Sequence, residues 1–252
     1  MMQKEEFMLQ KRLIELSKTA YRRGIVTYSD FLNLNELNIL HTTPKDALDT
    51  RYETYGGYDD SERQMVAFLP DALYYTHFYP ICILKVEPLQ KKFSESLTHR
   101  DYLGSILNLG IERSKLGDIL VMDTCTYLFV QETLADFICD NLTRVRHTSV
   151  MVTVVEDHAF SYTPNYEEIT GSVASIRLDS LLSLAFGSSR SKLVPLIESG
   201  KVFANGKLMT TNSYQVKEGD IISVRGMGRF KYQGILSETK KGRYFVSLYK
   251  YI

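Results

Sequence analysis

Cysteine is scarce in this sequence of 252 residues. The three cysteines, Cys82, Cys125 and Cys139, are odd in number and widely spaced, and no CxxC pair is present. This argues against a disulfide framework, a zinc site and a redox motif, and we expect buried, reduced thiols. Long apolar runs are also missing: none reaches the roughly 18 residues of a membrane span, and the amino-terminal segment is charged and amphipathic, unlike a signal peptide. These absences predict a cytoplasmic protein with no membrane contact, no metal and no cofactor.

An excess of either charge is missing too, since Lys+Arg and Asp+Glu each total 30. The neutral total hides an asymmetry along the chain. Residues 172–252 hold 13 Lys+Arg and 5 Asp+Glu, a net charge of +8, which leaves 17 and 25 in residues 1–171, a net charge of −8. A split of this size favours a polyanion as the partner of the basic part. A solvated basic surface without a partner would give the same count.

The first part of the chain has helical patterns. Residues 3–23 repeat apolar positions at a spacing near 3.6 residues, and Gly24 ends this helix. Two short helical patterns follow around residues 29–40. The stretch TYGGYDDSERQMVAFLP then supplies a Gly-Gly turn and a short helix that ends at Pro70. We therefore predict a small α-rich domain over residues 1–75.

The middle of the chain alternates strand and helix patterns in the order βαββαβ. The successive segments are ICILKVEPL, HRDYLGSILNLG, DILVMD, TYLFVQ, ETLADFICDNL and SVMVTVVE. This order is the split-βαβ plan shared by RNA-recognition and ferredoxin-like domains, which predicts such a domain over residues 76–165. Alternation places Tyr127 and Phe129 on one sheet face, where RNA-recognition domains stack bases, but the basic-Gly-aromatic signature is absent. The acidic, turn-rich TPNYEEITGS predicts a linker at about residues 161–172.

The last part predicts two packed helices followed by hairpins, as a domain over residues 172–252. Apolar residues recur at i, i+3, i+4 and i+7 from Leu178 and at i, i+3 and i+4 from Leu193, and Gly187 and Gly200 end the two helices. Asn205-Gly206 is a strong hairpin-turn signal, and KEGD before IISVR is a second turn. One further hairpin follows to the end of the chain, with Lys240-Lys241-Gly242 at its turn.

Cationic side chains cannot share the buried helix faces, so they must lie outside. Arg177, Arg190 and Lys192 fall near the amino-terminal ends of the two helices, where the free N–H groups and the helix dipole favour anions. Lys201 and Lys207 flank the hairpin. The stretch SRSKLVPLIESGKVFANGK therefore predicts a phosphate-binding corner.

These residues carry a resemblance to a known module. RLDxxL, SRSxxxxLIxxGxVxxNGK and GDxIxV over about residues 174–226 resemble the S4 domain, a small αL-type RNA-binding domain. With GGYDDSER and HRDYLGSILNLGIERSKLGDI, the whole chain is similar to the YlmH family of bacterial S4-domain proteins, which is encoded among cell-division genes. That resemblance implies an α+β protein that binds structured RNA, ribosomal RNA or tRNA on the large ribosomal subunit, in quality control of stalled nascent chains.

The S4 resemblance also implies which residues contact RNA. Asp179 is expected to orient Arg177 or Arg190, because a carboxylate facing a phosphate would repel it. For the basic residues beyond the S4 core, protection of a sheet edge is the alternative. The acidic amino-terminal and middle domains are expected to contact a protein or a neighbouring RNA element. The RNA-binding set is Arg177, Asp179, Ser189, Arg190, Lys192, Lys201, Asn205, Lys207, Arg225, Arg229 and Lys231.

Enzymatic alternatives fit the sequence less well. HRDYLGSILN has Ile106 where the kinase catalytic loop places Asn, so we expect Asp101 to cap a helix instead. RLDSLLSL shares RLD with some S4-containing pseudouridine synthases but lacks the Thr-Ser-Gly that follows there. We therefore predict a protein without catalytic residues, with an RNA-modifying enzyme and a division-linked scaffold as the alternatives.

Overall fold

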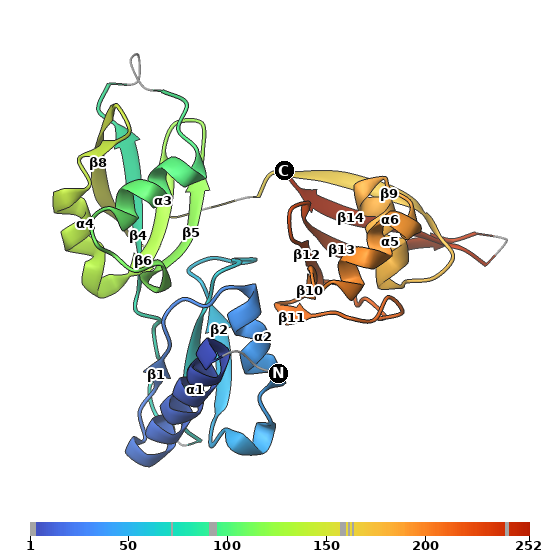
Figure 1. Cartoon of the computed structure of the whole chain (residues 1–252), viewed down its shortest axis with the longest axis horizontal. Helices are drawn as coiled ribbons and strands as arrows, with labels where there is room; N and C mark the ends of the chain where they lie inside the picture. Colours follow the sequence, from blue (N-terminus) through green and yellow to red (C-terminus); the bar gives the residue numbers. More distant parts are fainter. Residues whose placement is uncertain are drawn as a thin grey trace. The chain divides into compact units, whose positions relative to one another are not determined.

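The structure is a computed structural model, and it describes residues 4–71, 73–90, 95–156, 160, 162, 164–239 and 242–252. The chain divides into two compact units, Met1–Tyr162 and Thr163–Ile252. Figure 1 shows the course of the chain through helices and strands of both units. Within the described residues, no helix is long and apolar enough to cross a membrane.

The first unit opens with two helices on a small antiparallel sheet. A capping box between Asn33 and Glu36 starts the second helix, in which the Asn33 side chain accepts two backbone N–H bonds. Leu13 and Phe68 are among the buried residues that join the helices to the sheet. The elements are α1 (Lys4–Arg23), β1 (Thr27–Tyr28), α2 (Leu34–Thr42), the 3₁₀ turn η1 (Lys45–Ala47), β2 (Arg51–Tyr55) and β3 (Met65–Leu69), with strand order β1-β3-β2.

Two details of the amino-terminal prediction are wrong. The short helix expected to end at Pro70 is strand β3, and one helix, α2, stands where two short helical patterns were expected. All five residues of β3 are buried, so their side chains give a continuous apolar run that does not distinguish a strand from a buried helix. The region is thus a pair of helices on a small sheet, and the prediction of an α-rich domain missed the sheet.

The middle of the first unit has the predicted βαββαβ order with one addition, the short strand β7 between α4 and β8. Its sheet order is β5-β6-β4-β8-β7 with antiparallel pairing throughout, the arrangement of a split-βαβ domain. Helices α3 and α4 cover one sheet face, with Ile106 and Ile138 fully buried against it. The elements are β4 (Ile81–Pro88), α3 (His99–Leu107), η3 (Arg113–Lys115), β5 (Leu116–Val121), β6 (Thr126–Gln131), η4 (Glu132–Leu134), α4 (Ala135–Asn141), β7 (Arg144–Val145) and β8 (Thr148–Val155).

Polar side chains join the two sheets of the first unit. Asp118 on β5 accepts hydrogen bonds from the Tyr58 hydroxyl (2.8 Å) and from the backbone N–H groups of Glu62 (2.7 Å) and Arg63 (3.1 Å). The buried Arg63 guanidinium donates in return to the carbonyl oxygens of Leu116, Phe31 and Arg113. The segments GGYDDSER and IERSKLGDI therefore hold each other in place.

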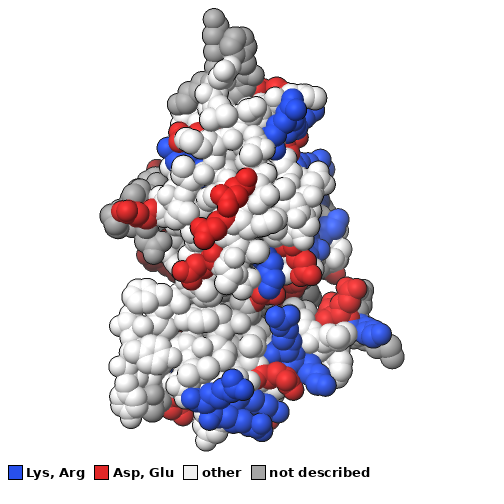
Figure 2. Space-filling view, turned by 90° about the vertical axis from the view of Figure 1, so that its left-hand side faces the viewer, with Lys and Arg blue, Asp and Glu red and all other residues white. Residues whose placement is uncertain are grey.

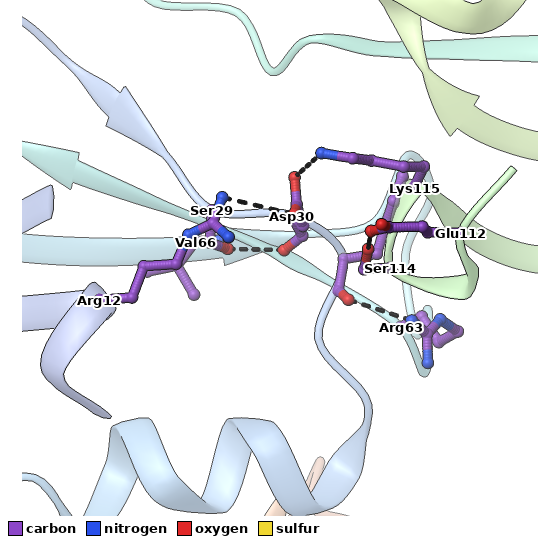
Figure 3. Close-up of polar contacts among 9 residues, drawn as sticks. Arg12, Ser29, Asp30, Arg63, Val66, Glu112, Ser114 and Lys115 are labelled. Atoms are coloured by element: carbon purple, nitrogen blue, oxygen red, sulfur yellow. Dashed lines mark hydrogen bonds and ion pairs between the residues drawn. The ribbon is translucent and has the colours of Figure 1, made fainter. Parts of the chain in front are cut away.

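A second set of contacts at this join is drawn in Figure 3. The Lys115 ammonium lies 2.7 Å from one carboxylate oxygen of Asp30, whose other oxygen lies 3.5 Å from Arg12. Burial and the neighbouring charge of Arg63 lower the pKa of Arg113 to about 10, and its guanidinium donates to the carbonyl oxygens of Leu116 and Gly117. These charged groups serve the packing of the unit.

The second unit is a six-stranded sheet with a helix pair on it. Leu181, Leu182, Leu193 and Ile197, at the predicted positions, enter one core with the strands. Gly187 adopts a left-handed conformation (φ 58°) at the end of the first of these helices. The elements are β9 (Tyr166–Val173), α5 (Leu178–Phe186), α6 (Arg190–Glu198), β10 (Val202–Ala204), β11 (Lys207–Leu208), β12 (Ile221–Val224), β13 (Gly228–Glu238) and β14 (Tyr244–Tyr251), in sheet order β11-β10-β12-β13-β14-β9.

The predicted linker at residues 161–172 is largely a strand. Residues 166–173 form β9, which pairs with β14 along all eight of its residues. Only Val173 of this strand is buried, so apolar alternation gives no signal for it. The predicted last hairpin is present as β13 and β14, while Lys240 and Lys241 at its expected turn lie outside the described residues.

Candidate nucleic-acid interface

Asp179 links the amino-terminal ends of the two S4-region helices. Its side chain is 7% exposed and lies 3.2 Å from Nε of Arg177 and 3.8 Å from a guanidinium nitrogen of Arg190. The two arginine side chains are 37% and 50% exposed. As predicted, the carboxylate orients arginines, and it contacts both of them. Each guanidinium is held by the carboxylate and remains partly exposed to solvent.

Arg190 has a second anchor that the sequence analysis did not identify. A guanidinium nitrogen donates to the Ser180 hydroxyl at 2.6 Å, and Ser180 is buried in the first turn of α5. Arg190 is also the first residue of α6, after the exposed N-cap residue Ser189, whose hydroxyl lies 3.0 Å from that of Ser191. Ser180 directly follows Asp179 in RLDS, but its role depends on a helix pairing that local patterns do not reveal.

The hairpin turn places Asn205 and Gly206 in left-handed conformations, with φ of 48° and 78°. This is the two-residue turn expected of an Asn-Gly pair. The Asn205 side chain donates to Asp220 (2.7 Å) and accepts from the backbone N–H of Ile221 (2.9 Å). These bonds give the Asn205 amide a role in holding the turn, in addition to the RNA contact that the S4 resemblance implies.

Asp220 holds this end of the unit together. It accepts from Asn205, from the Tyr214 hydroxyl (3.2 Å) and from the backbone N–H of Lys217 (2.8 Å), and it is buried. Burial and the charge of Asp220 raise the pKa of Tyr214, whose protonated hydroxyl donates to this carboxylate. The hairpin that carries two of the predicted lysines is therefore fixed to the turn before β12.

The remaining predicted cations lie along the helix and strand ends. Lys192, Lys201, Lys207 and Arg225 are exposed. Lys201 directly precedes β10 and Lys207 begins β11. The Arg225 backbone N–H donates to the carbonyl of Lys201, which ties these two residues together, and its guanidinium lies 5.4 Å from the centre of the Phe203 ring.

Arg229 and Lys231 lie on β13, beyond the S4 core. The Arg229 guanidinium stacks over the Tyr251 ring at 4.3 Å, beside a parallel pair formed by Tyr166 and Tyr249 at 4.1 Å. Both basic residues are partly buried rather than fully exposed. Packing along the part of the sheet formed by β13, β14 and β9 therefore accounts for much of the environment of these two residues.

The middle domain does not present the usual base-stacking face. Tyr127 and Phe129 share one side of the sheet, as predicted, but Phe129 is 1% exposed and packs in a cluster with Phe31 and Tyr58 of the amino-terminal region. The Phe129 ring centre lies 4.9 Å from that of Tyr58. The position at which an RNA-recognition domain would stack a base is already filled by the protein itself.

The HRD segment has a structural role at its aspartate. Asp101 accepts hydrogen bonds from the Thr98 hydroxyl (2.7 Å) and backbone N–H (2.8 Å), which makes a capping box at the start of α3. Both hydrogen bonds from Thr98 lower the pKa of Asp101, and the bond from the hydroxyl has the larger effect. Among the described residues, no group of three or more His, Cys, Asp or Glu side chains is arranged to hold a metal ion.

Charge on the first unit is mixed where it can be seen. On the face drawn in Figure 2, acidic side chains lie across the middle, and basic side chains lie along one edge and at the lower end, with wide uncharged areas between them. This fits the net charge of −8 in residues 1–171. The cations anchored by Asp179 belong to the second unit.

Comparisons with known proteins agree with this geometry. Residues 176–222 match the S4 domain, and residues 77–158 match the family described as "Putative RNA-binding domain in YlmH". The chain is therefore an RNA-binding protein of the S4-domain class. Through both matched regions it is similar to the YlmH family.

Individual relatives cover different parts of the chain. The "Ribosome-associated protein quality control protein P2" of Bacillus subtilis is 28% identical over 97% of this chain and 95% of its own length. The small ribosomal subunit protein uS4A of Clostridium novyi is 46% identical over 55 residues, 21% of this chain and 27% of that protein. The solved structure of the cell division protein ylmH from Streptococcus pneumoniae has a TM-score of 0.50 and 22% identity over 61% of this chain and 93% of its own, which shows a shared fold.

Proposed function

We propose that this protein binds phosphates of structured RNA on the large ribosomal subunit, in ribosomal RNA or in a bound tRNA, through the corner formed by α5, α6 and the β10–β11 hairpin. The single observation that supports this most is the buried Asp179 carboxylate, which holds two half-exposed guanidiniums at adjacent helix starts. Arginine side chains fixed in this way lose little conformational entropy on meeting a phosphate, which they engage through two hydrogen bonds.

The proposed RNA-binding residues fall into phosphate contacts and residues that position those contacts. Arg177, Arg190, Lys192, Lys201 and Lys207 are the proposed phosphate contacts, because all five are cationic and lie at helix starts or strand ends of one unit. Asp179 and Asn205 position them, and Ser189 presents its hydroxyl beside Arg190. Arg225, Arg229 and Lys231 extend the basic surface along β12 and β13. Phosphate contacts position a protein on RNA without reading its sequence, so shape must supply the specificity.

The proposed role is non-catalytic and lies in ribosome-associated quality control in the cytoplasm. The relative from Bacillus subtilis, similar over nearly its whole length, carries that process in its name. An S4 domain alone does not choose between ribosomal subunits, since the uS4 relatives are small-subunit proteins. We infer that the acidic parts, at about residues 1–75 and 76–165, choose the large subunit by contacting a protein or a second RNA element.

Crosslinking in cells followed by RNA sequencing tests this proposal. We expect reads concentrated in one region of large-subunit RNA or in tRNA, and fewer of them for an Arg190→Ala, Lys192→Ala double variant. Reads confined to the small subunit would contradict the assignment. Two other outcomes would favour the alternatives: a ribosomal RNA modification that disappears with the gene indicates an enzyme, and sedimentation away from ribosomes at low salt indicates a division-linked scaffold.

A further inference from the structure

A cavity of about 460 Å³ lies in the first unit, away from the S4 residues. Its volume falls within the range of about 300–1,000 Å³ that small-molecule sites have. It is bounded by the loop after β2, by the segment before β4 and by two residues that follow β8. Its aromatic lining consists of Tyr55, Tyr58, Phe78, Tyr79, Phe160 and Tyr162.

We propose that this cavity binds one unstacked nucleobase of single-stranded RNA, as a second RNA contact of the protein. The proposal rests on the proposed RNA-binding function but concerns a different site. Aromatic rings stack on the faces of any base, and they offer no cation to a phosphate, so such a lining suits a base better than a phosphate. The region that matches an RNA-binding domain begins at residue 77, so it includes Phe78, Tyr79, Ile81 and Ile83 of the lining.

The cavity wall is held in place before any ligand arrives. The Tyr58 hydroxyl donates to Asp118, and its ring packs on Phe129 and, at 5.3 Å between centres, edge-on against Tyr162. Gly57 has φ of 102°, and a Cβ there would lie 2.4 Å from the Phe129 ring. The loop therefore approaches the sheet as closely as only glycine allows, and this close approach fixes the Tyr58 ring beside the cavity.

A third side of the cavity comes from the segment before β4. The Tyr79 ring centre lies 5.4 Å from those of Tyr55 and His77, and the Tyr28 hydroxyl lies 3.2 Å from Nδ1 of His77. Phe78, which lies between His77 and Tyr79 in the sequence, is 79% exposed although it lines the cavity. A large apolar ring that lines the cavity and is mostly exposed is available to stack on an inserted base.

The charges around the cavity also favour a base. No lysine or arginine is among the described residues that line it, and the exposed Asp59 carboxylate at its edge would repel a phosphate. A carboxylate accepts hydrogen bonds from the amino group of adenine, cytosine or guanine. The site therefore complements the S4 corner, since one binds the ring of a nucleotide and the other binds backbone phosphates.

Two oligonucleotide probes test the inference on the full-length protein. One is a short single-stranded RNA with 2-aminopurine at its centre, and the other has an abasic residue at that position. We expect the wild-type protein to bind the first about 5-fold or more tightly than the second, and to quench its fluorescence, because stacking of one base contributes this much or more. Phe78→Ala should remove most of the difference and the quenching.

The control is Phe137→Ala, which removes another exposed phenylalanine of the same unit, on α4 and outside the cavity lining. It should behave as wild type. Equal affinity of the wild type for the two probes, or unchanged discrimination in Phe78→Ala, would overturn the inference. The Arg190→Ala, Lys192→Ala double variant separates the two sites. It should leave the ratio of the two probe affinities unchanged whether or not the S4 corner binds RNA, and it should weaken both probes only if the corner does bind RNA.

Discussion

The carboxylate of Asp179 lies 3.8 Å from the guanidinium of Arg190, and one partner is buried while the other is half exposed. The pair also joins the first turn of α5 to the first turn of α6. An aspartate placed in this way acts on RNA through the arginine it holds. This relationship makes the role of Asp179 testable apart from that of the cations.

Replacing Asp179 by asparagine should weaken RNA binding and lower the free energy of unfolding by about 1 kcal/mol, the scale of one charge-assisted hydrogen bond. The side chain keeps its size but loses the charge that attracts Arg177 and Arg190. Chemical denaturation and RNA titration measure the two effects. Glu198→Gln, an exposed change on α6, is the control. Loss of a pseudouridine from ribosomal RNA in the Asp179 variant would instead point to catalysis.

The position of the second unit along the chain predicts how fragments behave. Residues 163–252 carry 13 Lys+Arg and 7 Asp+Glu, a net charge of +6, and should bind structured RNA alone, whereas residues 1–162 should bind it more weakly. A fragment that starts at residue 172 loses nearly all of β9 and leaves β14 as an unpaired edge. It should therefore melt at a lower temperature. Equal RNA affinity of fragments 163–252 and 1–162 at matched salt would refute this division.

Asp118 should matter for stability and leave the S4 site unaffected. Asp118→Ala removes the acceptor for the Tyr58 hydroxyl and for two backbone N–H groups, so we expect a loss of roughly 2–4 kcal/mol in the stability of the first unit. Unfolding of residues 1–162 followed by circular dichroism measures it. Asp123→Ala, at the exposed turn between β5 and β6, should have little effect. A large loss of RNA affinity at the S4 corner in full-length Asp118→Ala would contradict the assignment.

The cap of α3 predicts a pH dependence. Hydrogen bonds from Thr98 lower the pKa of Asp101, so its carboxylate stabilises the folded state above its unfolded pKa of about 3.9, and this contribution is lost as the pH falls through the lower folded pKa. Asp101→Asn should thus destabilise the protein at neutral pH and change it less in acid. Urea denaturation of the wild type and the variant, at neutral pH and in acid below the folded pKa of Asp101, measures the two losses of stability. An equal loss at both would rule out the carboxylate as its source, and Asp140→Asn on α4 is the control.

Local signals explain which parts of this fold the sequence predicts. The helices α5 and α6, their terminal glycines and the Asn205-Gly206 turn each depend on neighbouring residues, and all were predictable. Strand β3 is buried on both faces. In β9 a glycine, Gly171, stands between the inward residues Ile169 and Val173, so neither strand shows a clear apolar alternation. Their pairing partners lie outside any local window.

The same distinction applies to the sites. The cations and Asp179 are recognisable because a compact motif contains them. The anchor from Ser180 to Arg190 depends on how two helices pack, and the aromatic cavity combines residues from 55 to 162. Only the folded chain brings those residues together.

Arginine and lysine at the corner should contribute unequally. Arg190→Ala should cost more RNA affinity than Lys192→Ala, because the guanidinium engages a phosphate through two hydrogen bonds and is held by Asp179 and Ser180. Lys192 is an exposed point charge on a flexible stem. Titration of both variants at one salt concentration compares them. A larger loss for Lys192→Ala would show that the anchored geometry does not matter.

The salt dependence of RNA binding reports directly on the phosphate contacts of the S4 corner. If Arg177, Arg190, Lys192, Lys201 and Lys207 neutralise about five phosphates, the logarithm of the association constant should fall against the logarithm of salt concentration with a slope of roughly −3.5 to −4.5. Each single alanine variant should make the slope shallower by about 0.7–0.9 while the fold stays intact. Anisotropy titrations of a labelled RNA stem-loop between about 50 and 200 mM salt give these slopes. An affinity independent of salt, or an Arg190→Ala, Lys192→Ala variant with the wild-type slope, would contradict the account.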